Sequence, residues 1–133
     1  MVLLWVLVLS AAAAAAWISK PAPGARMFDK LDPGHTGGVT LEAFLHHRSH
    51  RFQSLDANHD GQVTRAEFDA KSAGRDPART EASFHRFDTN GDGVITRAEW
   101  DAAEAARFAR IDANHDGVVT REEFLRDRVR AQS

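Results

Sequence analysis

Cysteine is absent from this chain, and long runs of like charge and methionine are scarce. Without cysteine there can be no disulfide bonds, thiolate zinc sites or thiol nucleophiles. The 17 basic residues are scattered among 19 acidic ones without a long run of like charge, which argues against nucleic-acid binding. Methionine occurs only at Met1 and Met27, so the chain lacks the Met-rich surface of proteins that bind many targets. What remains, in 133 residues, has the composition of one small globular domain.

The first 20 residues, "MVLLWVLVLSAAAAAAWISK", carry no charged side chain before Lys20. As a helix this segment would span roughly 27 Å, close to the thickness of a bilayer core. We therefore predict that residues 1–19 are an N-terminal anchor or signal segment that enters the membrane through residues 2–18. Small residues at 11–16 suit a cleaved signal, whereas the missing basic residue before the apolar core and the presence of Trp17 favour an uncleaved anchor. A buried helix is a third interpretation.

The location of the remaining chain is left open by its charges. Lys20, Arg26 and Lys30 follow the apolar segment and favour a cytoplasmic domain, whereas signal-like leaders indicate export to a periplasm or the cell exterior. Residues 20–26 contain two prolines and a glycine, which predicts a linker. The folded domain is expected over residues 27–133.

Three stretches of the domain share one pattern: "DANHDGQVTRAEF" from Asp56, "DTNGDGVITRAEW" from Asp88 and "DANHDGVVTREEF" from Asp112. Aspartate, asparagine, aspartate and glycine recur at positions 1, 3, 5 and 6, and threonine and glutamate at positions 9 and 12. This pattern resembles the calcium-binding loop of the EF-hand family. The resemblance implies helix-loop-helix units whose loops associate in pairs through short β-bridges.

Calcium chemistry explains why these residue types recur. Ca²⁺ takes six to eight oxygen ligands at about 2.3–2.6 Å, so the chain has to wrap closely around it. Glycine at position 6 permits the sharp turn, position 7 offers its backbone carbonyl, and glutamate at position 12 closes the shell with two oxygens. Three ions are therefore expected. Their candidate ligands are Asp56, Asn58, Asp60, Gln62, Thr64 and Glu67 in loop two (56–67), Asp88, Asn90, Asp92, Val94, Thr96 and Glu99 in loop three (88–99), and Asp112, Asn114, Asp116, Val118, Thr120 and Glu123 in loop four (112–123).

A fourth stretch, "DPGHTGGVTLEAF", is a degenerate copy that forms loop one at residues 32–43. It keeps Asp32 at position 1 but has Gly34, Thr36 and Ala43 where the other loops carry ligands. Glu42 lies one residue early, which on a helix turns it about 100° from the ion. We therefore predict that loop one binds no ion and serves to brace a working loop.

The spacing of the loops predicts which of them pair. Position 1 recurs at intervals of 24, 32 and 24 residues, so the chain is a two-loop unit duplicated with an offset of 56. Neither short interval contains a glycine or proline between its loops, and each is expected to form one continuous helix that holds its two loops apart. Loop two should then pair with loop three, with Val63 opposite Ile95, and loop one with loop four. The expected fold is all-α, with about six helices.

No pattern in the sequence indicates catalysis, so we expect a protein that is not an enzyme. His46 and His50 share a helix face at a spacing that suits zinc, but two ligands do not make a site. The leading hypothesis is a membrane-associated or exported calcium sensor or relay. The alternatives are a calcium-stabilised structural or interaction module and a calcium buffer.

Overall fold

The computed structural model describes residues 24–131, which form six helices and four short strands. In chain order the elements are α1 (Ala25–Leu31), β1 (Gly38–Thr40), α2 (Leu41–Leu55), β2 (Gln62–Thr64), α3 (Arg65–Lys71), α4 (Pro77–Phe87), β3 (Val94–Thr96), α5 (Arg97–Ile111), β4 (Val118–Thr120) and α6 (Arg121–Arg130). The all-α prediction with short strand pairs is therefore confirmed. Helix α1 begins two residues before the expected start of the domain at residue 27.

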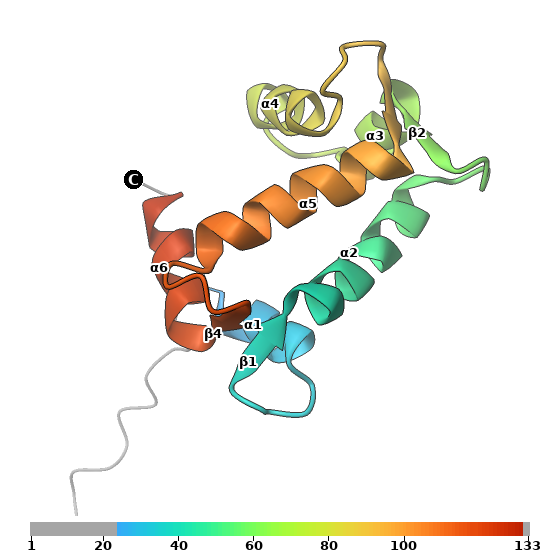
Figure 1. Cartoon of the computed structure of the whole chain (residues 1–133). Helices are drawn as coiled ribbons and strands as arrows, with labels where there is room; N and C mark the ends of the chain where they lie inside the picture. The colour runs from blue at the N-terminus through green and yellow to red at the C-terminus, as the bar shows by residue number, and fades with distance from the viewer. Residues whose placement is uncertain (1–23, 132–133) are drawn as a thin grey trace, which may run out of the picture.

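The two long helices, α2 and α5, pack side by side and connect the two ends of the molecule (Figure 1). Each runs without interruption from one loop to the next, as the absence of glycine and proline predicts. The longer interval, between loops two and three, is broken instead: α3 ends at Lys71 and α4 begins at Pro77. Asp76 caps α4 by accepting a hydrogen bond from the Ala78 N–H.

The loops pair as predicted. Strand β2 of loop two is antiparallel to β3 of loop three, with Val63 opposite Ile95. Strand β1 of loop one is antiparallel to β4 of loop four, with Val39 opposite Val119. All four side chains are fully or almost fully buried. Each pair of loops therefore closes one end of the molecule.

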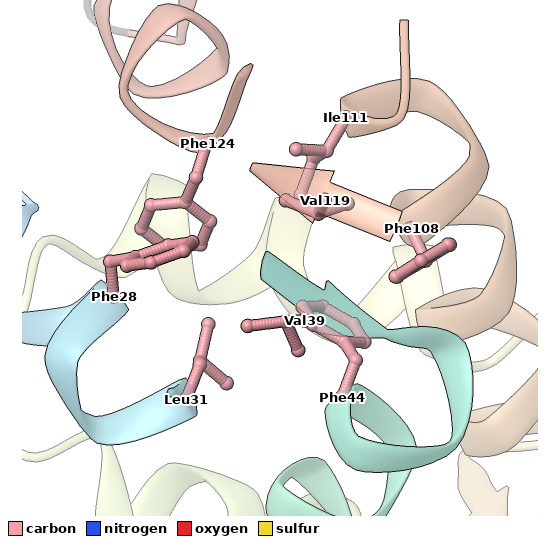
Figure 2. Packing of buried hydrophobic residues seen from close by; sticks show 8 residues of the cluster. All are labelled: Phe28, Leu31, Val39, Phe44, Phe108, Ile111, Val119 and Phe124. Atoms are coloured by element: carbon pink, nitrogen blue, oxygen red, sulfur yellow. The ribbon is translucent and has the colours of Figure 1, made fainter. Parts of the chain in front are cut away.

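Two hydrophobic clusters correspond to these two ends, which we call the 1/4 lobe and the 2/3 lobe after their loops. The core of the 1/4 lobe consists of Phe28, Leu31, Val39, Phe44, Phe108, Ile111, Val119 and Phe124 (Figure 2). The core of the 2/3 lobe consists of Phe52, Leu55, Val63, Phe68, Phe84, Phe87, Ile95 and Trp100. Helices α2 and α5 contribute to both cores, so neither lobe is built without the other.

Aromatic contacts between α2 and α5 follow the sequence duplication. Phe44 meets Phe108 with ring centroids 5.6 Å apart, and Phe52 meets Trp100 at 5.7 Å. Residues 44 and 100 are equivalent in the two halves of the chain, as are residues 52 and 108. The two contacts are therefore copies of each other, one in each lobe.

Candidate metal centres

Each of the three complete loops connects the end of one helix to the first turn of the next. Loop two begins at Asp56, which caps α2, and ends at Glu67, the third residue of α3. Thr64 caps α3 and forms a capping box with Glu67, in which each side chain bonds to the other residue's backbone N–H. The same threonine-glutamate box opens α5 and α6. Local helix capping thus positions the last ligand of each loop.

The acidic side chains of loop two are directed at the loop's own backbone. Asp56 accepts a hydrogen bond from the Gly61 N–H at 3.0 Å, and Asn58 Oδ1 accepts one from the Asp60 N–H at 3.0 Å. Asp60 in turn accepts from the Gln62 N–H at 2.9 Å. Gly61 has a φ of +83°, a conformation that favours glycine and turns the chain back over these oxygens. Positions 1, 3 and 5 therefore share one loop interior.

Glu67 is held at the edge of this interior by both carboxylate oxygens. Oε2 accepts hydrogen bonds from the Thr64 N–H at 2.8 Å and the Thr64 hydroxyl at 2.9 Å. Oε1 accepts from the Ala57 N–H at 3.1 Å and the Asn58 N–H at 3.4 Å. These bonds, led by the Thr64 N–H, lower the pKa of the Glu67 carboxyl from its ordinary value. The carboxylate is thereby kept charged and aimed at the loop.

Loops three and four repeat this frame almost unchanged. The position 1 aspartates accept from the position 6 glycines at 3.0 and 2.9 Å, and the position 12 glutamates accept from the threonine N–H groups at 2.9 and 3.0 Å. Loop three differs in two contacts: the Thr89 hydroxyl donates to Glu99 Oε1 at 3.2 Å, and the Gly91 N–H donates to Asp88 Oδ1 at 2.8 Å. The predicted ligands at position 7 are backbone carbonyl oxygens. They belong to the first residues of β2, β3 and β4, which are Gln62, Val94 and Val118. Each loop thus offers the same set of oxygens.

This donor set suits a hard divalent cation. Every complete loop has three carboxylates, one amide oxygen, one hydroxyl and one backbone carbonyl, and none has a nitrogen or sulfur ligand. Within residues 24–131, no group of three or more His, Cys, Asp or Glu side chains is arranged to hold a metal ion. In this conformation the acidic oxygens bond to backbone N–H groups, as described above.

Loop one keeps the shape of the others with a different set of contacts. Asp32 accepts hydrogen bonds from the Thr36 N–H at 2.9 Å, the Thr36 hydroxyl at 2.9 Å and the Gly37 N–H at 2.8 Å. Thr40 caps α2 and accepts only from the Ala43 N–H, so there is no capping box, and Glu42 is exposed. A neutral hydroxyl therefore occupies the interior where the other loops place a second carboxylate.

The backbone of position 4 was not anticipated from the sequence. His35, His59 and His115 all have left-handed backbones, with φ of 50°, 60° and 58°. Residues other than glycine seldom adopt this region, although Asn, Asp and His do so more often than the rest. All three side chains are exposed, as expected for a position that faces away from the ion. The signal that could have located this turn is the glycine at position 4 of loop three, Gly91, which has a φ of 73°.

The histidines of α2 lie together without forming a recognisable site. His46 and His50 are exposed, with ring centroids 5.1 Å apart, and His47 is half-buried. Burial and the neighbouring Arg48 lower the pKa of His47. These rings belong to a solvated face of the helix.

The structure also bears on membrane association. No helix within residues 24–131 combines the length and the apolar character needed to cross a bilayer. The segment predicted to be an anchor or signal, residues 1–19, lies outside the described part of the chain.

Comparison with known protein families agrees with the geometry of the loops. Residues 47–100 match the EF-hand domain pair, and residues 104–126 match the EF hand. The first match contains loops two and three, which are the loops that pair in the 2/3 lobe, and the second contains loop four. No curated protein matches the chain. Its EF-hand domains support calcium binding, and the chain belongs to the EF-hand calcium-binding family.

Proposed function

We propose that the protein binds three Ca²⁺ ions, one in each complete loop, and relays calcium binding through a conformational change. The observation that carries the proposal is the hydrogen-bond frame repeated in loops two, three and four, which gathers the same oxygens each time. The proposed ligands are the eighteen residues at positions 1, 3, 5, 7, 9 and 12 of these loops. A bound ion would supply positive charge to a loop whose proposed ligands include three carboxylates.

The long helices support a relay rather than three independent sites. Helix α5 begins at Arg97, within loop three, and ends at Ile111, directly before Asp112, the first residue of loop four. A movement at Glu99 on binding would therefore displace a helix that also carries part of the other lobe's core. Because packed cores shift between discrete arrangements, this coupling favours a two-state response.

A structural role for calcium is the second candidate. Among the large apolar side chains of residues 24–131, only Leu41 and Val129 are exposed, at 39% and 64%. A domain whose apolar residues are already buried has little surface to offer a target. In that case the ions would stabilise a rigid module, each adding about 2.7 kcal/mol at one hundred times its Kd.

Titration of the full-length chain with calcium separates these functions. We expect calorimetry to count three ions and a dye for exposed apolar surface to brighten as they bind. The Glu67→Gln/Glu99→Gln/Glu123→Gln variant serves as a control and should bind none. Three ions without dye binding would favour the structural role, and the absence of any bound ion would refute both.

We further propose that residues 1–19 place this activity at a membrane or outside the cytoplasm. The proposal rests on the length and apolar character of that segment. Cell fractionation followed by mass spectrometry of the N-terminus tests it. A membrane-bound chain beginning at Met1 supports the anchor, and a chain exported and shortened after the alanine run supports a cleaved signal. An intact chain in the soluble cytoplasm would contradict both.

A further inference from the structure

A cavity of about 570 Å³ lies between α2, α4, α6 and the connection from α3 to α4. It falls within the size range of small-molecule sites. Half of its twelve lining residues are arginines: Arg48, Arg51, Arg75, Arg79, Arg86 and Arg128. Arg128 belongs to α6 in the 1/4 lobe and the others to α2, α4 and the connection before α4, so the cavity forms only when the two lobes are packed together.

The positive charge of the cavity is largely uncompensated. Arg48 pairs with Glu104 at 2.5 Å, and Arg79 lies 3.8 Å from Asp76. Six guanidinium groups against these two carboxylates leave a formal excess of +4. The remaining four arginines are Arg51, Arg75, Arg86 and Arg128. Within residues 24–131, no carboxylate lies close enough to them, at 4.0 Å or less, to form an ion pair.

Burial and neighbouring charges shift the pKa of two of these arginines. Burial, followed by repulsion from Arg48, lowers the pKa of Arg51. Burial also lowers the pKa of Arg86; Glu104 opposes this shift, whereas Arg110 and Arg48 add to it. Both side chains reach solvent, yet the surrounding cavity wall removes part of their water. Guanidinium groups nevertheless stay charged in proteins, so the repulsion persists until an anion relieves it.

Two of the lining arginines, Arg48 and Arg128, each have a buried Nε without a hydrogen-bond acceptor within residues 24–131. The Arg48 side chain is only 8% exposed, and its Nε has no hydrogen-bond partner within residues 24–131 even though its other end bonds to Glu104. The buried Nε of Arg128 also lacks a partner in the described chain. Both nitrogen atoms are covered by protein, so the exposed arginines Arg51, Arg75 and Arg86 are the groups that an anion in the cavity would reach.

We propose that this cavity binds a small anion that carries two or more phosphate groups. The planar guanidinium matches phosphate oxygens in a two-pronged contact, which a lysine cannot do. Ser72, Thr80 and Ser83 also line the cavity, and their hydroxyls can bond to further oxygens. A monovalent anion would leave most of the excess charge in place, whereas a polyphosphate offsets it. The concave shape admits a free polyphosphate or a protruding phosphorylated headgroup, and not a flat membrane surface.

Calorimetry on the full-length chain with tripolyphosphate tests the proposal. Calcium is first removed with a chelating resin, since calcium binds polyphosphates and a soluble chelator is itself a polyanion. We expect one tripolyphosphate per chain, at least tenfold tighter than inorganic phosphate and weakened by added NaCl. The absence of saturable binding, or equally tight binding of a polyglutamate peptide, would overturn the proposal.

Matched variants distinguish the cavity from general charge attraction. Arg51→Gln/Arg86→Gln should weaken tripolyphosphate binding at least tenfold. The control Arg26→Gln/Arg126→Gln removes the same net charge from exposed residues outside the cavity and should leave the affinity within twofold. Equal weakening in both variants would overturn the site. If circular dichroism shows that the cavity variant is unfolded, Arg75→Gln replaces it, because Arg75 is exposed and lies outside the helices. An unchanged affinity of Arg75→Gln for tripolyphosphate would overturn the proposal.

The source of the phosphate is found by competition. Vesicles of phosphatidylcholine containing a polyphosphorylated inositol lipid should displace tripolyphosphate if the ligand is a headgroup, and plain phosphatidylcholine vesicles should not. If neither displaces it, the ligand is a free polyphosphate. Both results support a phosphate site, and displacement by plain vesicles would overturn it.

Discussion

Arg48 and Glu104 stand at equivalent positions of the duplicated sequence, 56 residues apart, and their side chains pair with each other at 2.5 Å. The duplicated halves thus differ in charge at the point where they meet. The pair lies between α2 and α5, with Arg48 92% and Glu104 99% removed from solvent. Two equivalent arginines or two equivalent glutamates here would repel, so this difference allows the halves to pack.

Glu104→Ala tests the importance of this pair. The substitution leaves Arg48 buried without its partner, and we expect it to lower the free energy of unfolding by about 3 kcal/mol. Replacing both residues, with Arg48→Met/Glu104→Leu, should recover most of the loss, because no uncompensated charge then remains. Urea denaturation in saturating calcium measures both. The control Asp101→Ala breaks an exposed pair with Arg97 and should cost under about 1 kcal/mol.

Glu99→Gln tests the assignment of the closing ligand in loop three. Removing one of its carboxylate oxygens should lower the number of bound ions from three to two. The affinity of loop two should fall about tenfold as well, because β2 and β3 pair the two loops. Loop four, which α5 connects to loop three, should weaken less than loop two. Calorimetry measures these changes, and Asp101→Asn, an exposed change on the same helix, is the control. Loss of the loop four ion while loop two keeps its affinity would show that the strand pairing does not set the coupling.

Gly38→Ala tests the bracing role of loop one. A Cβ at this position would lie 2.4 Å from Val118 Cγ1 across the β1–β4 pair, and the stiff valine side chain has little freedom to move. We expect a loss of about 1–3 kcal/mol in thermal denaturation and weaker calcium binding in loop four. In the control Gly34→Ala, the added Cβ would make only an ordinary van der Waals contact, so the melting temperature should not change. Wild-type behaviour of Gly38→Ala would show that β1 is not needed beside β4.

Asp32→Asn tests the internal contacts of loop one through their pH dependence. The Thr36 N–H is the main cause of a pKa below the ordinary value of 3.8. The ionised carboxylate therefore stabilises the fold above pH 3.8, and this contribution is lost as the pH falls through the lower folded-state pKa. We expect the variant to melt below the wild type at pH 7, with a difference that shrinks below pH 3.8. A difference that stays constant from pH 7 to 2 would contradict this account.

Calcium itself should change the electrostatic character of the chain. Three bound ions would move the formal net charge from −2 to +4. We therefore expect stronger adsorption of the full-length chain to anionic than to neutral vesicles only when calcium is present, a difference that 0.5 M NaCl removes. Comparing the triple glutamate variant under the same conditions isolates the contribution of the bound ions. Equal calcium dependence in that variant would assign the effect to the lipid.

Much of this protein is determined by its sequence alone, because its loops are local structures. Twelve consecutive residues contain the turn glycine, the ligand oxygens and the threonine cap, so Asp56 and Glu67 need no distant residue to be placed. Helix continuity is local too, and it predicted that Val63 would lie opposite Ile95. The left-handed backbone of His35, His59 and His115 was not predicted, because the type of side chain does not fix this conformation.

Other features were decided only by the tertiary structure, because they depend on which helix faces meet. Arg48 and Glu104 are separated by 56 residues, and nothing near either one indicates a buried partner. The arginines of the cavity likewise come from three helices and a connection, and along the chain they look like ordinary solvated charges. Local chemistry therefore predicts the calcium ligands. Packing of the two lobes, in contrast, decides where positive charge accumulates, since charge density depends on distances that only the folded chain defines.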